Sequence, residues 1–337
     1  MVESRFFFGK LGYLNYEYVN CLVKDIINQF KINNIKLVIS VLDPIAATAA
    51  KILNLPLVSI TQACFHPEKI HSRIRWWEEL PNELPNVVNV FNRILSNNSL
   101  NTIETVEDLF MSELTIIPSV KEFDPVKDEN AFYTGIMSWE YSVNHDIDYN
   151  YLFESGKKTI CAYTGRMYDS GGKSGLLILE NIINAFEDSD YRVIITTGVG
   201  EMPDVYKNKQ FSNNLRVFEW ISISKIINKM DLIIHHGGHG LSLQSILAGK
   251  PSLVIPTHDE REYNARQLQE LGVGQYIHPE RVTPDILRCK ASALIEDDAI
   301  LNNAARCSDK ILKSNYIGAR GAAELIMKIL VNQQTSH

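Results

Sequence analysis

Residues 231–249, DLIIHHGGHGLSLQSILAG, carry the strongest structural signal in this sequence. The apolar run DLIIH predicts a β-strand, Gly237, Gly238 and Gly240 follow it, and LSLQSILA predicts a helix that closes on Gly249. The start of a helix offers N–H groups and the positive end of the helix dipole, and glycines let the backbone approach an anion closely. The stretch therefore predicts an α/β domain with a phosphate site at this turn.

Two other interpretations of the turn stay open from the residues alone. The glycines can form a tight strand-to-helix connection whose histidines only pack. His235, His236 and His239 could instead hold a metal ion, but no carboxylate or cysteine completes a ligand set. We therefore expect no metal here, and we expect His236 to donate from its ring to a diphosphate oxygen.

The rest of the second half alternates strand and helix in the same manner. Further apolar strands are predicted at 158–165, 192–198, 215–220 and 252–256. Several of them are apolar on both faces, as strands covered by helices on two sides are. Thr164 and Gly165 end the first of these strands, at the sheet edge where ligands of such folds bind, so both are candidates for contact with phosphate or acceptor.

The first half is more mixed. The run KLVISVL at 36–42, a helix from Pro44 and the run LPLVSI at 55–60 predict one βαβ unit. Strand-like pieces follow at 114–118 and 131–134, and 5–9 is a further candidate strand.

Periodicity is lost over 137–157, which indicates an interdomain linker. We therefore expect a Rossmann-like domain over 1–140, a linker over 141–157 and a second Rossmann-like domain over 158–337. The last helix, at about 320–331, could pack back on the first domain.

Composition limits the classes of function. The 337 residues are 45% hydrophobic and 22% charged, which is typical of a globular chain with two domains. A net charge of −7 argues against nucleic-acid binding, which needs clustered Lys and Arg. No leader or membrane-spanning stretch is evident, so we expect a cytoplasmic protein. The cysteines are widely spaced without a CxxC pair, which indicates reduced thiols: Cys21, Cys64, Cys161, Cys289 and Cys307.

The segment from Trp220 through HHGGHG to NARQLQELGVG resembles the donor-site signature of UDP-glycosyltransferases and their bacterial macrolide- and MurG-like relatives. The resemblance covers roughly 30–330 and is specific only over 215–275. It implies the GT-B fold, with two facing Rossmann-like domains built on parallel sheets. It also implies a UDP- or dTDP-sugar as co-substrate, no cofactor, and metal-independent, inverting transfer.

The same resemblance implies roles for individual residues. The run from His236 to Gly240 matches the HGGxG turn that holds the diphosphate, and Trp220 with Ile221 matches the segment against the nucleobase. Gln244 stands at the ribose-binding Glu position.

Two further parts of the signature depart from the family pattern. Leu241 replaces the hydroxyl residue after the turn, with Ser242 beside it. Glu260 and Arg261, with Asp259 adjacent, stand where the family has the Asp-Gln pair that contacts sugar hydroxyls. Arg261 therefore leaves the donor sugar open.

Sugar transfer also needs a base that deprotonates the acceptor hydroxyl. In the family this base is a His after the first N-terminal strand, oriented by an Asp. Asp43 matches the Asp position, but no histidine precedes it, so the base is unknown and the N-terminal domain looks shortened. Asp43 could equally cap the helix from Pro44. His66 and His71 lie in the acceptor half and could substitute as base.

We therefore predict a glycosyltransferase that moves a sugar from UDP or dTDP to a hydroxyl of an unidentified small-molecule or lipid acceptor. The alternative is a catalytically impaired GT-B protein that binds nucleotide sugar, or a partner subunit, as an auxiliary factor. A truncated enzyme whose open sheet edge self-associates is a third interpretation. A GT-B epimerase is a weaker one, because no pair of acidic residues suits proton transfer. Homo-oligomer and partner subunit both stay open.

Overall fold

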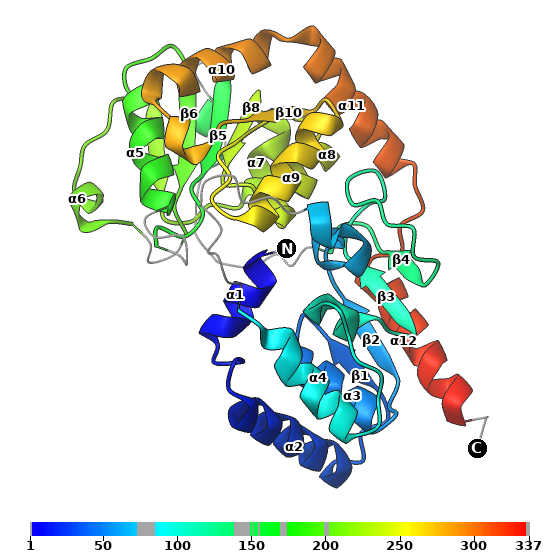
Figure 1. The fold of residues 1–337 in the computed structure, drawn as a ribbon. Coiled ribbons are helices and arrows are strands. Elements are labelled where there is room, and N and C mark those ends of the chain that lie inside the picture. The colour runs from blue at the N-terminus through cyan, green and yellow to red at the C-terminus, as the bar shows by residue number, and fades with distance from the viewer. Residues whose placement is uncertain are drawn as a thin grey trace. The chain divides into compact units, whose positions relative to one another are not determined.

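The computed structural model describes residues 2–72, 85–137, 149, 151–153, 156–168, 174–198 and 202–334. The chain forms two compact units, each with its own parallel sheet (Figure 1). Unit 1 comprises Met1–Met137 and Tyr316–His337, and unit 2 comprises Ser138–Asn315. The last helix belongs to unit 1, and the sequence had left open that this helix packs back on the first domain.

Unit 2 is built on a six-stranded sheet of order β10-β9-β8-β5-β6-β7, and all its strand pairs are parallel. Its strands are β5 (Thr159–Tyr163), β6 (Arg192–Thr196), β7 (Leu215–Phe218), β8 (Leu232–His235), β9 (Ser252–Val254) and β10 (Gly274–Tyr276). Its helices are η4 (Tyr151–Phe153), α5 (Ser174–Phe186), α6 (Asp204–Lys207), α7 (Ile223–Ile226), η5 (Ile227–Lys229), α8 (His239–Leu247), α9 (Asp259–Glu270), η6 (Pro279–Arg281), α10 (Pro284–Glu296) and α11 (Asp298–Leu312).

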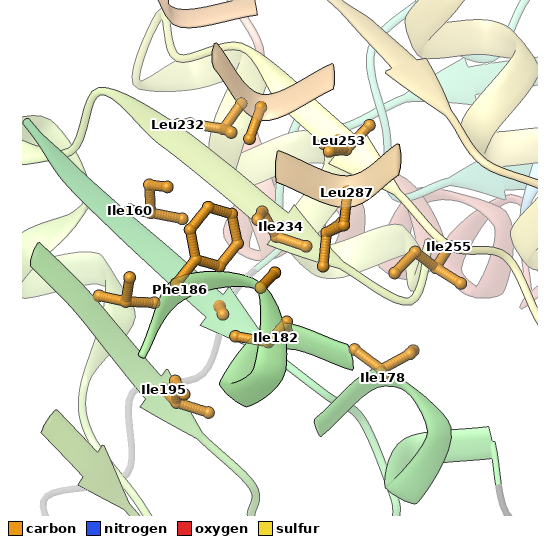
Figure 2. Packing of buried hydrophobic residues seen from close by; sticks show 14 of the residues in the cluster. Ile160, Ile178, Ile182, Phe186, Ile195, Leu232, Ile234, Leu253, Ile255 and Leu287 are labelled. Atoms are coloured by element: carbon orange, nitrogen blue, oxygen red, sulfur yellow. The ribbon is translucent and has the colours of Figure 1, made fainter. Parts of the chain in front are cut away.

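Both faces of this sheet are buried. Ile160 and Ile234 pack with Phe186 of α5 on one face (Figure 2). The neighbouring strand residues Cys161 and Ile233 belong to a second cluster on the other face, with α7 and η5. Successive side chains of a strand point to opposite faces, so the apolar runs read from the sequence serve two layers of helices.

The strand order reverses direction at β5. The chain adds β6 and β7 on one side of β5, then returns to add β8, β9 and β10 on the other. The carboxyl ends of β5 and β8 are therefore neighbours from which the chain departs in opposite directions. This is the switch point at which open α/β sheets bind ligands.

Unit 1 has a four-stranded parallel sheet of order β1-β2-β3-β4. Its strands are β1 (Val38–Ser40), β2 (Leu57–Ile60), β3 (Leu114–Ile117) and β4 (Ala131–Tyr133). Its helices are α1 (Val2–Lys10), α2 (Tyr16–Ile32), α3 (Pro44–Ile52), η1 (Ala63–Phe65), η2 (Pro67–Ser72), α4 (Val87–Asn97), η3 (Val106–Phe110) and α12 (Gly318–Gln334).

Helix α12 returns to unit 1 by packing on its sheet. Ala322, with Ile326 and Ile329, contacts Val58 of β2 and Ile116 of β3. On the other face, α2, α3 and α4 pack over a larger apolar cluster. The expected linker over 141–157 lies partly outside the described residues. Its described part includes η4, whose Leu152 is buried in an apolar cluster of unit 2.

The candidate strand at 5–9 is wrong, because these residues form part of helix α1. Phe8 of α1 is buried and stacks on Tyr13, whose ring meets Phe91 edge-on. This aromatic packing stabilises the helix, although a run of phenylalanines by itself favours a strand. No helix among the described residues has the length and apolar character to cross a membrane.

Candidate functional site

The carboxyl ends of β5 and β8 lie side by side, with Tyr163 in register with His235. Strand β5 leads to Thr164 and Gly165, and β8 leads into the glycine turn that opens α8. Residues far apart in sequence therefore meet at the switch point of unit 2.

Gly237 shapes the turn. Its φ of 92° lies in the left-handed region, and a Cβ added there would meet the carbonyl oxygen of Arg261 at 2.7 Å. Its N–H donates to Nδ1 of His235 at 3.1 Å, and its carbonyl accepts from Nδ2 of Asn264 at 2.9 Å. A buried side chain thus holds each side of this glycine, and only glycine fits the position.

His235 acts in the turn as a neutral imidazole. Burial lowers the pKa of His235 to about 3. Because Nδ1 accepts the Gly237 N–H, the ring proton sits on Nε2. His235 therefore supports the backbone and is fully enclosed, with no exposed surface to offer a ligand.

The imidazole of His236 lies between two glycines. A Cβ on Gly165 would stand 2.9 Å from Cγ of His236, and one on Gly238 would stand 2.7 Å from Nε2. Tyr163 meets the same ring edge-on, with centroids 5.2 Å apart. His236 is 9% exposed, and its ring lies against Gly238, the N-cap of α8. Gly165, which ends the β5 segment, is therefore needed to accommodate His236.

Helix α8 begins without a side-chain cap. Its N-cap is Gly238, which has no side chain to bond the first turn. Gly240 in that turn is exposed, and nothing lies within 4 Å of a Cβ built there. A helix start that is uncapped and open in this way suits an anion.

Helix α9 begins beside the same turn. Burial raises the pKa of the Glu260 carboxyl, and the charges of His239 and Arg261 oppose that rise. Glu260 accepts from Nδ2 of Asn264 at 2.9 Å. The Arg261 guanidinium bonds the hydroxyl of Thr257. The start of α9 therefore brings a carboxyl and a guanidinium to the turn.

Four residues expected at the donor site have buried side chains, and three of these side chains make hydrogen bonds to the backbone of the unit. Ser242 is fully buried and its hydroxyl donates to the carbonyl of Gly238, one turn earlier. Thr164 bonds the Gly165 carbonyl, and Asp259 is fully buried and accepts from the Glu260 N–H. Ile221 belongs to the apolar cluster under α7 and is 3% exposed.

Trp220 and Gln244 are partly exposed. Trp220 follows β7, and Gln244 lies in α8. The structure thus gathers the turn, His236, His239, Glu260 and Arg261 around the start of α8, with Gly165 behind them. Asn264 was missed as a site residue, although the sequence places it on the helix that follows β9.

Asp43 and His66 lie in unit 1, and both are occupied by structural bonds. Asp43 accepts from the N–H groups of Ile45 at 2.9 Å and Ala46 at 3.1 Å, which makes it the N-cap of α3. His66 is 3% exposed; its Nε2 lies 3.1 Å from Asp128, and its Nδ1 accepts from the backbone of Glu68. With both ring nitrogens engaged, His66 does not suit a base. The His71 side chain lies outside the described residues.

Metal binding by the three histidines of the turn gains no support. Among the described residues, no group of three His, Cys, Asp or Glu side chains is placed to hold a metal ion. His235 in addition uses Nδ1 on the backbone.

Residues 180–316 match the family described as erythromycin biosynthesis protein CIII-like, C-terminal domain. The match includes the switch-point strand β8, the glycine turn and α9.

The chain is similar to the NDP-glycosyltransferase YjiC of Bacillus subtilis (strain 168), with 32% identity over 143 residues. That alignment covers 42% of this chain, and the chain spans only 36% of the length of the relative.

Two solved structures share the fold. The glycotransferase of kitacinnamycin aligns with a TM-score of 0.71 at 16% identity, over 94% of this chain and 83% of that chain. The Streptomyces sp. SF2575 glycosyltransferase SsfS6, complexed with thymidine diphosphate, aligns with a TM-score of 0.61 at 17% identity, over 94% of this chain and 76% of that chain.

Proposed function

We propose that the chain is a GT-B glycosyltransferase that transfers a sugar from a nucleoside diphosphate to an acceptor hydroxyl. The match of residues 180–316 to the CIII-like C-terminal domain, the similarity to the NDP-glycosyltransferase YjiC and the fold shared with the kitacinnamycin glycotransferase support this proposal. The observation that carries the proposal is the open start of α8 at the switch point of unit 2, with the His236 ring fixed beside it. The N–H groups of this turn would bind the diphosphate, and His236 would donate to one of its oxygens.

The same geometry suits the chemistry of the leaving group. Negative charge builds on the nucleoside diphosphate as the bond to the sugar breaks. Donors that are already held in place stabilise this charge without further reorganisation, and the turn is held by His235 and Asn264. We therefore propose a metal-independent transfer in which the helix start and His236 stabilise the leaving diphosphate. That the transfer inverts the anomeric carbon is what the resemblance to the family implies.

The nucleobase and the sugar would lie on opposite sides of the turn. Trp220 and the backbone of Ile221, after β7, would contact the base, and Gln244 of α8 would contact the ribose. Glu260 and Arg261 would face the sugar. The thymidine diphosphate in the similar SsfS6 structure supports a nucleoside diphosphate as the carrier. We propose UDP or dTDP for this role.

We propose no role as base for His66, because both of its ring nitrogens are bonded within unit 1, and we assign Asp43, expected as the orienting carboxylate, to the cap of α3. The acceptor is proposed only as a small molecule or lipid that carries a hydroxyl group. Incubation with UDP- and dTDP-sugars labelled in the sugar tests the activity. Release or transfer of labelled sugar is expected. Binding without either reaction over long incubation would contradict the transferase and favour an auxiliary binding protein.

A further inference from the structure

The side-chain amide of Asn264 joins two parts of the proposed site. Its Nδ2 donates to the carbonyl of Gly237 at 2.9 Å and to Oε1 of Glu260 at 2.9 Å. A carbonyl oxygen can only accept, so the nitrogen of the amide must face Gly237. One NH₂ group, with its two protons, therefore spans the diphosphate turn and the carboxyl at the start of α9.

The bond to Gly237 also orients the backbone beyond it. In a planar trans peptide the carbonyl of Gly237 and the N–H of Gly238 point in opposite directions. Because Asn264 holds the carbonyl toward α9, the N–H of Gly238 points away from α9, at the start of α8. The amide thus determines the direction of a group that the proposed site offers to the diphosphate.

Packing alone does not account for an asparagine here. Asn264 is fully buried, and its Oδ1 has no hydrogen-bond partner within the part of the chain that the structure describes. A buried oxygen without a partner destabilises the fold, so an apolar residue would pack at less cost. What the asparagine adds is the pair of bonds made by its nitrogen.

We propose that Asn264 is a positioning residue that couples the diphosphate turn to sugar recognition by Glu260. This inference rests on the donor site proposed above and adds a coupling between its two halves. Asn264 itself touches neither the diphosphate nor the sugar.

A double-mutant cycle tests this coupling. Calorimetry compares the wild type, Asn264→Ala, Glu260→Ala and the double variant with UDP, dTDP and a panel of their glucose and N-acetylglucosamine conjugates. With the diphosphate alone, Asn264→Ala is expected to bind about tenfold more weakly than the wild type. In the wild type, the sugar is expected to increase the affinity over that for the diphosphate alone. This increase should disappear in either single variant, with no further loss of affinity for the sugar in the double variant.

Gln269→Ala, on the exposed part of α9, is the matched control and should leave both affinities unchanged. If Asn264→Ala does not fold, Asn264→Ser supplies the same comparison with a smaller loss of volume.

The coupling would be overturned if each single variant lost only part of the affinity contributed by the sugar and the two losses added in the double variant. It would also be overturned if no sugar of the panel changed the affinity of the wild type. A wild type that binds neither diphosphate would instead overturn the donor site itself, and the two failures are therefore distinguishable.

Discussion

Nδ1 of His235 accepts the N–H of Gly237 at 3.1 Å, so the last residue of β8 fixes the first glycine of the turn that follows it. The ring is fully buried, and burial lowers its pKa to about 3 from the ordinary value of 6.5. The backbone of the turn thus depends on an imidazole that must stay neutral.

This bond predicts a pH dependence of folding. Between pH 3 and 6.5 the unfolded chain protonates His235 while the folded chain does not, so the free energy of unfolding falls as the pH falls. This one group contributes up to about 1.4 kcal/mol per pH unit to the slope. His235→Asn keeps an acceptor for Gly237 and does not titrate. Urea unfolding at several pH values from 7 to 4 should show that the free energy of unfolding falls less steeply with falling pH in the variant than in the wild type. An equal dependence on pH in both proteins would contradict the neutral buried imidazole.

Gly165 is predicted to be essential for the position of His236. Gly165→Ala places a Cβ 2.9 Å from Cγ of the ring at a φ of 73°, so the ring must move. We expect diphosphate affinity to fall at least about tenfold, as for a lost charge-assisted hydrogen bond. Gly156→Ala is the matched control, because its φ of 65° carries the same backbone strain with nothing within 4 Å. Equal affinities for the two variants would show that Gly165 does not position His236.

We predict that glycine at position 240 makes α8 less stable but leaves space for the ligand at the start of the helix. Gly240→Ala adds a Cβ that meets nothing within 4 Å, and alanine in a helix is favoured over glycine by about 0.5 kcal/mol or more. The melting temperature should therefore rise. Diphosphate affinity should fall at the same time, because the new methyl group stands in the first turn of α8. Tighter or unchanged binding would place the ligand elsewhere.

Asp43 is predicted to act on stability alone. Asp43→Ala removes the cap of α3 and should lower the free energy of unfolding by about 1 kcal/mol. Asp43→Asn retains a capping oxygen and should match the wild type in both stability and transfer rate. A large loss of transfer in Asp43→Asn at unchanged stability would instead restore Asp43 to a catalytic role.

The α/β class and the parallel sheets were predictable because long apolar runs bounded by glycine have few other structures. Strand β10 was missed, since its GQY sequence has no apolar run and the strand forms by pairing with β9. The run of phenylalanines in α1 predicted a strand by its apolar character, but its packing against Tyr13 stabilises a helix instead.

The glycine turn could be found from sequence because its geometry excludes other residues, as the φ of Gly237 shows. The local sequence pattern does not show whether a side chain at the site points toward a ligand or into the protein. Ser242 and Asp259 stand at the expected positions, yet both are buried and bonded to backbone. Asn264 was overlooked because its bond to Gly237 joins residues on different elements, which no local pattern reveals.

The most direct test of the donor site is calorimetric titration of the wild type and His236→Ala with UDP and dTDP. His278→Ala, which removes an imidazole just after the edge strand β10, serves as the control for loss of a histidine. We expect the wild type and His278→Ala to bind at least one of the two diphosphates equally well. His236→Ala should bind it about 10- to 100-fold more weakly while it melts cooperatively. Binding that His236→Ala leaves unchanged, or no binding by the wild type, would contradict a diphosphate site at the start of α8.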